Sequence, residues 1–136
     1  MTGLLLYCLM AGPQSSGDLV REARQALNEA EQTAAKSGKA CKDGRYEECN
    51  AMLNQTEESV ERAKESLDKT GINPSRSPRH FKDAEIRVRK ILKVLRDVAS
   101  YIHPDDQRHY DRVVNRLSDI NDQLLSSVME KKKKKK

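Results

Sequence analysis

Cys41 and Cys49 are the residues whose placement most directly suggests chemistry, because they flank a short turn. Lys42, Asp43 and Gly44 make that turn. In a helical hairpin the two cysteines would lie within about one helical turn of facing each other. We predict a disulfide that staples the hairpin and stabilises it by about 2–3 kcal/mol. The alternative is a pair of buried free thiols that pack as small apolar residues.

Histidines and carboxylates make a weaker case for metal chemistry. Asp106 and His109 form an Asp-x-x-His pair on one helix face. Di-metal bundles use such a pair twice, with carboxylates from two further helices. Here the pair occurs once and the apolar stripes carry no carboxylate, so we expect exposed or capping roles. Because two cysteines fall short of a zinc site and no glycine-rich phosphate loop is present, we predict no catalytic residue, cofactor or metal.

Four basic residues could contact anions, namely Lys82, Arg89, Lys93 and Arg96. Their spacing places them on the outward side of one predicted helix, and six lysines at 131–136 raise the net charge from −1 to +5. Anion contacts of this kind are salt-sensitive. No aromatic residues alternate with the basic ones, as single-stranded nucleic acid would require. The alternative is a solvated face balanced by the acidic helix before it.

Four stretches must position all of these residues, because each carries apolar side chains at alternating steps of three and four. That spacing makes one apolar side along an α-helix. The stripes are Val20, Ala23, Leu27, Ala30, Ala34, Ser37 and Cys41; Tyr46, Cys49, Leu53, Thr56, Val60, Ala63 and Leu67; Phe81, Ala84, Val88, Ile91, Leu95, Val98 and Ile102; and Tyr110, Val113, Leu117, Ile120, Leu124 and Val128. The sequence predicts an all-α fold, an antiparallel four-helix bundle built from two helical hairpins.

Capping and breaking residues set the limits of these helices. The helices are expected to begin near Asp18, after Asp43 or Gly44, at Pro78 and at Pro104, and to end near Cys41, Lys69, Ile102 and Met129. Ser16 or Gly17 would cap the first helix and Ser77 the third. Gly71 is expected in the left-handed conformation that ends the second.

The third predicted helix has the widest apolar arc. Beyond Lys90 its apolar residues are Ile91, Leu92, Val94, Leu95, Val98, Ala99, Tyr101 and Ile102. This width predicts contact with two neighbours, so we place the centre of the core there. The helix is basic and the second helix is acidic, from which we expect the two to pack side by side. Ile86 faces outward, where it marks either a contact with another molecule or nothing.

A short apolar stretch, 4–11, opens the sequence and is followed by small and polar residues. This is the pattern of a secretory signal cleaved after Ala11, although the usual basic residues before it are missing. The alternative is a short buried segment or a frayed apolar end. Loss of the signal would remove Cys8 and leave an even number of cysteines in an oxidising compartment. We divide the chain into a leader over 1–17, a four-helix bundle over 18–130 and a disordered lysine tail over 131–136.

Two segments resemble known proteins. Gly44–Cys49 (Gly-Arg-Tyr-Glu-Glu-Cys) resembles the Gly-Asp-Tyr-Glu-Glu-Ala turn of tetratricopeptide repeats, which implies a shared way of making a helical hairpin. The second half, from Arg79–Glu85 to Asp119–Leu125, resembles uncharacterised small exported helical proteins from bacteria. The latter resemblance implies export and a helical bundle, and no activity.

These features predict a non-enzymatic exported protein that acts through its surface, as a scaffold or protein-binding module with an unknown protein partner. The alternative is a nonspecific binder of anionic polymer, nucleic acid included, or of an anionic membrane surface. It would use the basic residues of the third helix and the lysine tail. The oligomeric state stays open.

Overall fold

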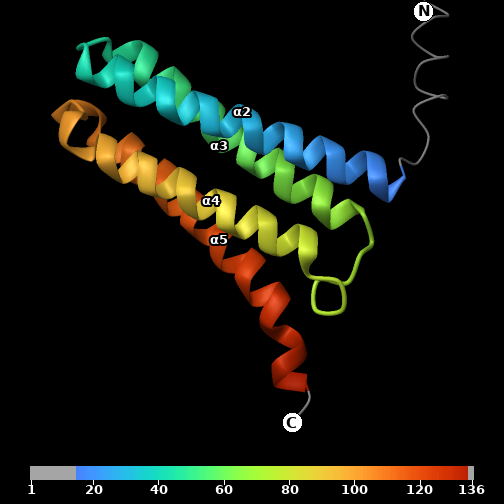
Figure 1. Cartoon of the computed structure of the whole chain (residues 1–136). Helices are drawn as coiled ribbons and strands as arrows, with labels where there is room; N and C mark the ends of the chain where they lie inside the picture. The colour runs from blue at the N-terminus through green and yellow to red at the C-terminus, as the bar shows by residue number, and fades with distance from the viewer. Residues whose placement is uncertain (1–14, 135–136) are drawn as a thin grey trace, which may run out of the picture.

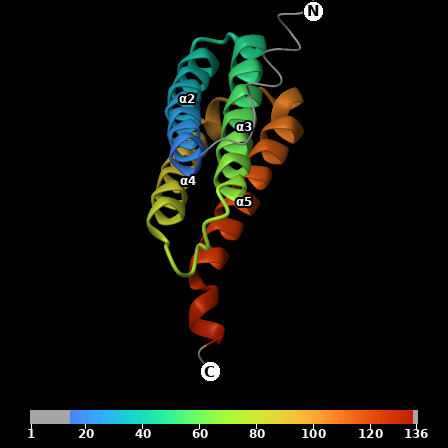
Figure 2. The same ribbon diagram turned by 90° about the vertical axis from the view of Figure 1, so that its right-hand side faces the viewer.

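The computed structural model describes residues 15–134, which form four long α-helices and no strand. The elements are α2 (Ser16–Lys42), α3 (Tyr46–Lys69), α4 (Arg79–Val98), the 3-10 helices η1 (Ala99–Tyr101) and η2 (Pro104–Asp106), and α5 (Gln107–Lys134). In Figure 1 each helix runs opposite to the one before it, and Figure 2 shows the four helices gathered into a bundle. The predicted all-α helical bundle is confirmed.

The helices occupy the corners of a square. The pair α2 and α3 packs most closely, α4 packs against α5, and the two hairpins meet where α2 lies along α4 and α3 along α5. In contrast, α3 and α4 hardly touch, so they lie across the diagonal. The expectation that the acidic and basic helices pack side by side is wrong. Exposed ion pairs contribute only a few tenths of a kcal/mol each, too little to override the apolar packing that sets the arrangement.

The predicted stripes form the core. All seven stripe residues of α2 and all seven of the α4 stripe are buried, as are those of α3 and α5 with two exceptions. Tyr46 is 38% exposed at the start of α3, where its ring meets His103 edge-on with centroids 5.0 Å apart. Val128 is half-buried near the end of α5. The apolar periodicity therefore identified the inward side of every helix.

The expected ends of α2 and α3 and the expected start of α4 lie within two residues of the observed ones, whereas α4 ends at Val98, four residues before Ile102, and α5 begins at Gln107, three residues after Pro104. A 3-10 helix follows α4 (η1) and another precedes α5 (η2).

The Ser15 hydroxyl caps α2 and accepts a hydrogen bond from the Asp18 N–H at 3.2 Å, so the cap lies one residue before Ser16. The α4 helix starts at Arg79, and Pro78 occupies its cap position. Gly71 has φ 74°, the left-handed conformation predicted for it.

The described helices extend beyond the predicted four-helix bundle at both of its ends. Residues 1–14, with Cys8 and the expected cleavage point after Ala11, lie outside the described residues, whereas Ser16 and Gly17 of the proposed leader belong to α2. The α5 backbone stays helical through Lys134, four residues into the tail that we expected to be disordered. Lysine is a good helix former, and its charge suits the C-terminal end of a helix. Within residues 15–134, none of the helices combines the length and apolar character that crossing a bilayer requires.

Candidate functional site

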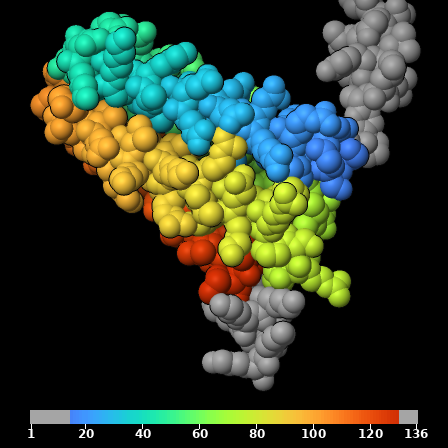
Figure 3. Space-filling view, viewed as in Figure 1, coloured from blue at the N-terminus to red at the C-terminus, as the bar shows by residue number. Residues whose placement is uncertain are grey.

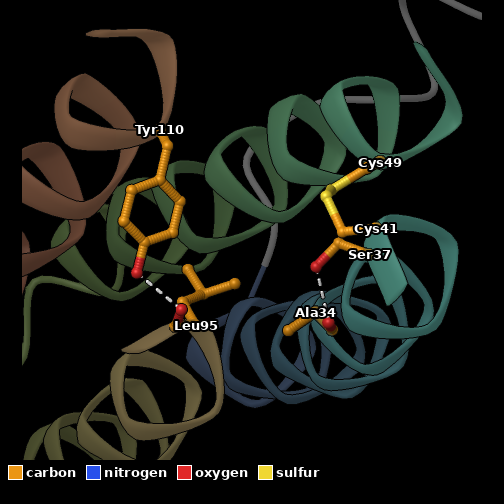
Figure 4. Close-up of a disulfide and its surroundings, with 6 residues drawn as sticks. All are labelled: Ala34, Ser37, Cys41, Cys49, Leu95 and Tyr110. Carbon is orange, nitrogen blue, oxygen red and sulfur yellow. Dashed lines mark hydrogen bonds between the residues drawn. A yellow bond between two sulfur atoms is a disulfide. The ribbon is translucent and has the colours of Figure 1, made fainter. Parts of the chain in front are cut away.

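The predicted disulfide links α2 to α3. Cys41 and Cys49 are bonded through their sulfurs, with Cα atoms 5.3 Å apart, and both side chains are buried (Figure 4). The turn between them is closed by a hydrogen bond from the Arg45 N–H to the Ala40 carbonyl at 2.8 Å, and Gly44 has φ 79°. A crosslink at the end of a hairpin fixes the register of its two helices, which makes this a structural site.

The predicted anion-binding residues all lie exposed on α4, but they are not equivalent. Arg89 forms two hydrogen bonds with Glu85, at 2.7 Å from Nη2 to Oε1 and 3.1 Å from Nε to Oε2. The other three, Lys82, Lys93 and Arg96, have no ion pair among the described side chains. One of the four charges is therefore already compensated.

Glu85 is a buried carboxylate that the sequence analysis missed, since no carboxylate was expected on an inward side. Its side chain is only 8% exposed. Asn121 of α5 donates hydrogen bonds to its backbone carbonyl at 2.9 Å and to Oε2 at 3.1 Å. The hydrogen bonds from Arg89 lower the pKa of Glu85, which outweighs the opposing effect of burial. The signal that could have found this pair is the arginine four residues after the glutamate.

The Asp-x-x-His pair gains no further ligands. His109 is half-buried, its Nδ1 lies 3.1 Å from Arg112 Nη2, and its buried Nε2 has no hydrogen-bond partner among the described residues. Asp106 lies in η2. Among the side chains of residues 15–129, no three His, Cys, Asp or Glu residues gather closely enough to hold a metal ion. The pair thus stays an isolated feature of the start of α5.

Charge separates across the diagonal of the bundle. Within α3 there are seven acidic and three basic residues, and within α4 seven basic and three acidic. The interhelical ion pairs do not join these two helices. They are Glu29–Arg62 between α2 and α3, Glu31–Arg87 between α2 and α4, and Glu61–Arg116 between α3 and α5. The acidic and basic edges consequently stay exposed on opposite sides.

A groove follows the boundary between α2 and α4, on the face shown in Figure 3. Its larger part, about 320 Å³, is lined by Ala35, Gly38, Lys39, Lys42, Val94, Asp97 and Val98. Beyond Val94 it continues into a second part of about 230 Å³, lined also by Glu31, Ala34, Lys90 and Ile91. We call these two parts together the α2–α4 groove.

Small residues on α2 create this groove. A Cβ atom at Gly38 would lie 3.1 Å from Val98 Cγ2, so the two helices approach closely there. Beside this contact, Ala34 and Ala35 are too short to fill the space above α4. The Val94 side chain consequently remains 39% exposed on the opposite wall. The groove therefore exists because the short alanine side chains of α2 do not cover Val94 of α4.

The wide apolar arc of α4 explains what lines the groove, and it corrects an expectation. Five residues of the arc are buried as expected: Ile91, Leu92, Leu95, Val98 and Ile102. Val94 and Tyr101 are 39% and 43% exposed instead of lying in the core. The arc is wider than the space between α2 and α5, so its surplus apolar residues reach the surface beside α2.

The rim of the groove is basic. Lys39 and Lys42 extend from α2 and Lys90 from α4, and none of the three has an ion pair among the side chains of residues 15–129. The ammonium of Lys42 lies 5.2 Å from the centre of the Tyr101 ring, a cation–π contact. Glu31 is held by Arg87 at 2.9 Å. Three lysines and one carboxylate without an ion pair among the described side chains, Asp97, therefore border an apolar floor.

No protein-family model, no curated protein and no solved structure matches this chain. The two resemblances noted in the sequence stay predictions.

Proposed function

We propose that this chain is an exported, non-enzymatic protein-binding module that docks a partner protein in the α2–α4 groove. The observation that carries the proposal is the exposure of Val94 and Tyr101 beside a groove floored by small apolar residues. Water contact with such side chains is unfavourable, and covering them contributes about 25 cal/mol per Å² of apolar surface, against which the entropic cost of association must be set. Apolar and aromatic anchors ringed by polar residues are typical of protein interfaces.

The disulfide supports the exported location in this proposal. Bonds between cysteines persist in secreted and periplasmic proteins, whereas cytosolic thiols are kept reduced. The two cysteines of the described residues are both used in Cys41–Cys49. The resemblance of the second half to small exported helical proteins supports the same location.

Site-specific photocrosslinking in the native host tests the docking surface. A photoreactive phenylalanine analogue placed at Val94 should give a discrete crosslinked protein, and the same analogue at Ala51, which is exposed on α3, should not. Replacing Ala35 by Arg would fill the groove and remove the adduct, while Ala51→Arg, the same change on α3, would leave it. Equal adducts at both positions, or an adduct that survives Ala35→Arg, would refute the proposal.

The diagonal arrangement favours a second candidate, a nonspecific binder of anionic polymer or membrane surface. Because α3 lies across the bundle, it does not neutralise Lys82, Lys93 and Arg96, and among the described side chains Arg89 is the one of the four that forms an ion pair. Binding to vesicles containing about one-third phosphatidylserine should then fall steeply between low and high salt. Affinity that ignores salt would exclude this candidate. So would affinity that survives both loss of residues 131–136 and replacement of the four basic residues by Gln.

A further inference from the structure

We infer that the α2–α4 groove takes an acidic amphipathic α-helix of about three turns, presented by the partner protein. The inference rests on the proposed function and names the class of its partner. Its length follows from α2, because Glu31 to Lys42 is twelve residues, and the eleven steps between them, at a rise of 1.5 Å each, give about 16.5 Å. A helix of three turns covers that distance.

The rim determines the charge of the occupant. Lys39, Lys42 and Lys90 lie along both walls, and none of them forms an ion pair with another described side chain. Of the lining carboxylates, Glu31 is held by Arg87, so Asp97 alone opposes the three lysines. Carboxylates along both flanks of an incoming helix would meet these ammonium groups, whereas a basic helix would be repelled.

The floor determines the shape of the occupant. The side chains of Ala34, Ala35 and Gly38 are small or absent, so a partner helix can approach closely. Val94 can then pack between apolar residues of the partner helix at positions i, i+3 or i+4, and i+7. An extended peptide gains affinity mainly from main-chain hydrogen bonds to a sheet edge. The described residues form no strand, and the groove walls are helices whose backbone groups are already paired. A helical peptide pairs its own backbone groups and therefore needs no main-chain hydrogen bonds from the groove.

A second copy of this chain fits the groove less well. Its most acidic helix is α3, whose outward side carries Glu47, Ala51, Glu58 and Glu65, all exposed. That side supplies carboxylates but only one small apolar residue. It could match the lysines without filling the floor, so we assign the groove to a different protein.

A displayed peptide library tests the inference. Helical 14-residue peptides would carry Ala, Val or Leu at four positions on one side and Glu, Gln or Lys at the flanking positions, and would be selected on the full-length protein. We expect Glu to be enriched over Lys on the flanks. The affinity of the best peptide should fall at least tenfold with the triple substitution Lys39→Glu, Lys42→Glu and Lys90→Glu. The matched control, Lys36→Glu, Lys69→Glu and Lys82→Glu, changes the net charge equally outside the groove and should have little effect.

The outcomes separate the inference from the proposed function. The inference is overturned if the selected helices carry neutral or basic flanks. If such helices also lose binding to the Ala35→Arg protein, binding in the groove itself still stands. Helices bound equally by Ala35→Arg and Ala51→Arg proteins overturn both. The inference is also overturned if no helical peptide is retained, or if heparin binds with the same dependence on the three lysines. In either case, photocrosslinking at Val94 decides whether the proposed function holds. Self-association that the triple substitution abolishes assigns the groove to a second copy instead. Circular dichroism establishes that every variant is folded.

Discussion

The two hairpins of this bundle are built from the same periodicity but from side chains of different size. Along the α2–α3 contact the stripes are rich in small residues, including Ala30, Ala34 and Ala63, and these helices lie closest together. The α4–α5 stripes are dominated by Phe, Leu, Ile and Val, and Figure 1 shows α5 diverging from α4 toward its C-terminal end. Side-chain size at the contact sets the distance between helix axes, so spacing alone predicts a bundle but not its shape.

Polar contacts differ between the hairpins in the same way. In α2–α3 two short hydroxyls meet, with Thr33 Oγ1 2.7 Å from Thr56 Oγ1, and the disulfide closes one end. In α4–α5 longer groups bridge a wider gap: the Tyr110 hydroxyl donates to the Leu95 carbonyl at 2.6 Å (Figure 4), and Asn121 donates to Glu85. A covalent bond and close helix packing stabilise the first hairpin. Large apolar side chains, together with long polar side chains that extend from α5 to α4, stabilise the second.

If large side chains hold the second hairpin, removing one should have the greatest effect. Leu117→Ala, at a fully buried site of α5, should lower the free energy of unfolding by about 2–5 kcal/mol, because it leaves a cavity. Urea denaturation measures this value. Leu125→Ala on the same helix, where the side chain is 47% exposed, should change stability by less than about 0.5 kcal/mol. Similar losses from both substitutions would contradict the packing we describe.

The staple of the first hairpin gives the next largest effect. Replacing Cys41 and Cys49 together by Ser should lower the free energy of unfolding by about 2–3 kcal/mol, as expected for closing a short loop in the unfolded chain. Thermal unfolding with and without reductant measures it. Reductant should destabilise the wild-type protein and leave the double variant unaltered. A wild-type melting temperature insensitive to reductant would show that the bond contributes nothing.

Close approach in the first hairpin should make it intolerant of larger side chains. Ala30→Leu, at a fully buried site of α2, should destabilise by about 1–3 kcal/mol through overpacking, although leucine is otherwise a good helix former. The matched control is Ala51→Leu on the exposed side of α3, which should be nearly neutral. Chemical denaturation of both variants decides the matter, and a stabilising Ala30→Leu would mean that unfilled space lies between α2 and α3.

The buried carboxylate of the second hairpin gives a smaller, pH-dependent effect. Folding lowers the pKa of Glu85, so its ion pair stabilises the protein above the ordinary pKa of 4.5, and this contribution is lost as pH falls through the lowered value. Glu85→Gln should cost about 1 kcal/mol at neutral pH. The wild-type advantage should shrink on acidification below 4.5 in urea titrations at several pH values. An advantage that is unchanged at low pH would show that the charge is not responsible.

The contribution of Glu57 on α3 to stability should depend on pH in the opposite direction, and its substitution should have the smallest effect of the five. Burial, followed by repulsion from Glu61, raises its pKa, so protonation favours the folded state and its contribution to stability improves as pH falls through the raised value toward 4.5. Glu57→Gln should therefore leave stability unchanged or raise it by up to about 0.5 kcal/mol at neutral pH. The same titrations measure this difference. A clear loss at neutral pH would mean that Glu57 has a favourable partner.

The sequence predicted the inward side of each helix and the disulfide because both depend on local spacing. It did not predict which helices are neighbours, since periodicity within one helix carries no information about the corner of the bundle that it occupies. The side-by-side placement of the acidic and basic helices failed for this reason. The groove depends on the same missing information: Val94 is a core residue or a surface residue according to the size of the side chains on α2 opposite it. The Glu85–Arg89 pair has a local signal in its i,i+4 spacing, whereas the contact of Glu85 with Asn121, 36 residues away, cannot be predicted from spacing within one helix.

The placement of α3 and α4 at opposite corners gives the molecule a transverse electric dipole moment. Torque from a charged object acts on such a dipole before any surfaces meet, over roughly the 8 Å by which salt at physiological strength limits electrostatic forces. A negatively charged partner would thus turn the α4 edge, and with it the adjoining groove, toward itself during the last step of diffusion. Collisions would then be sorted by orientation, and the fraction that arrives correctly aligned would fall as ionic strength rises.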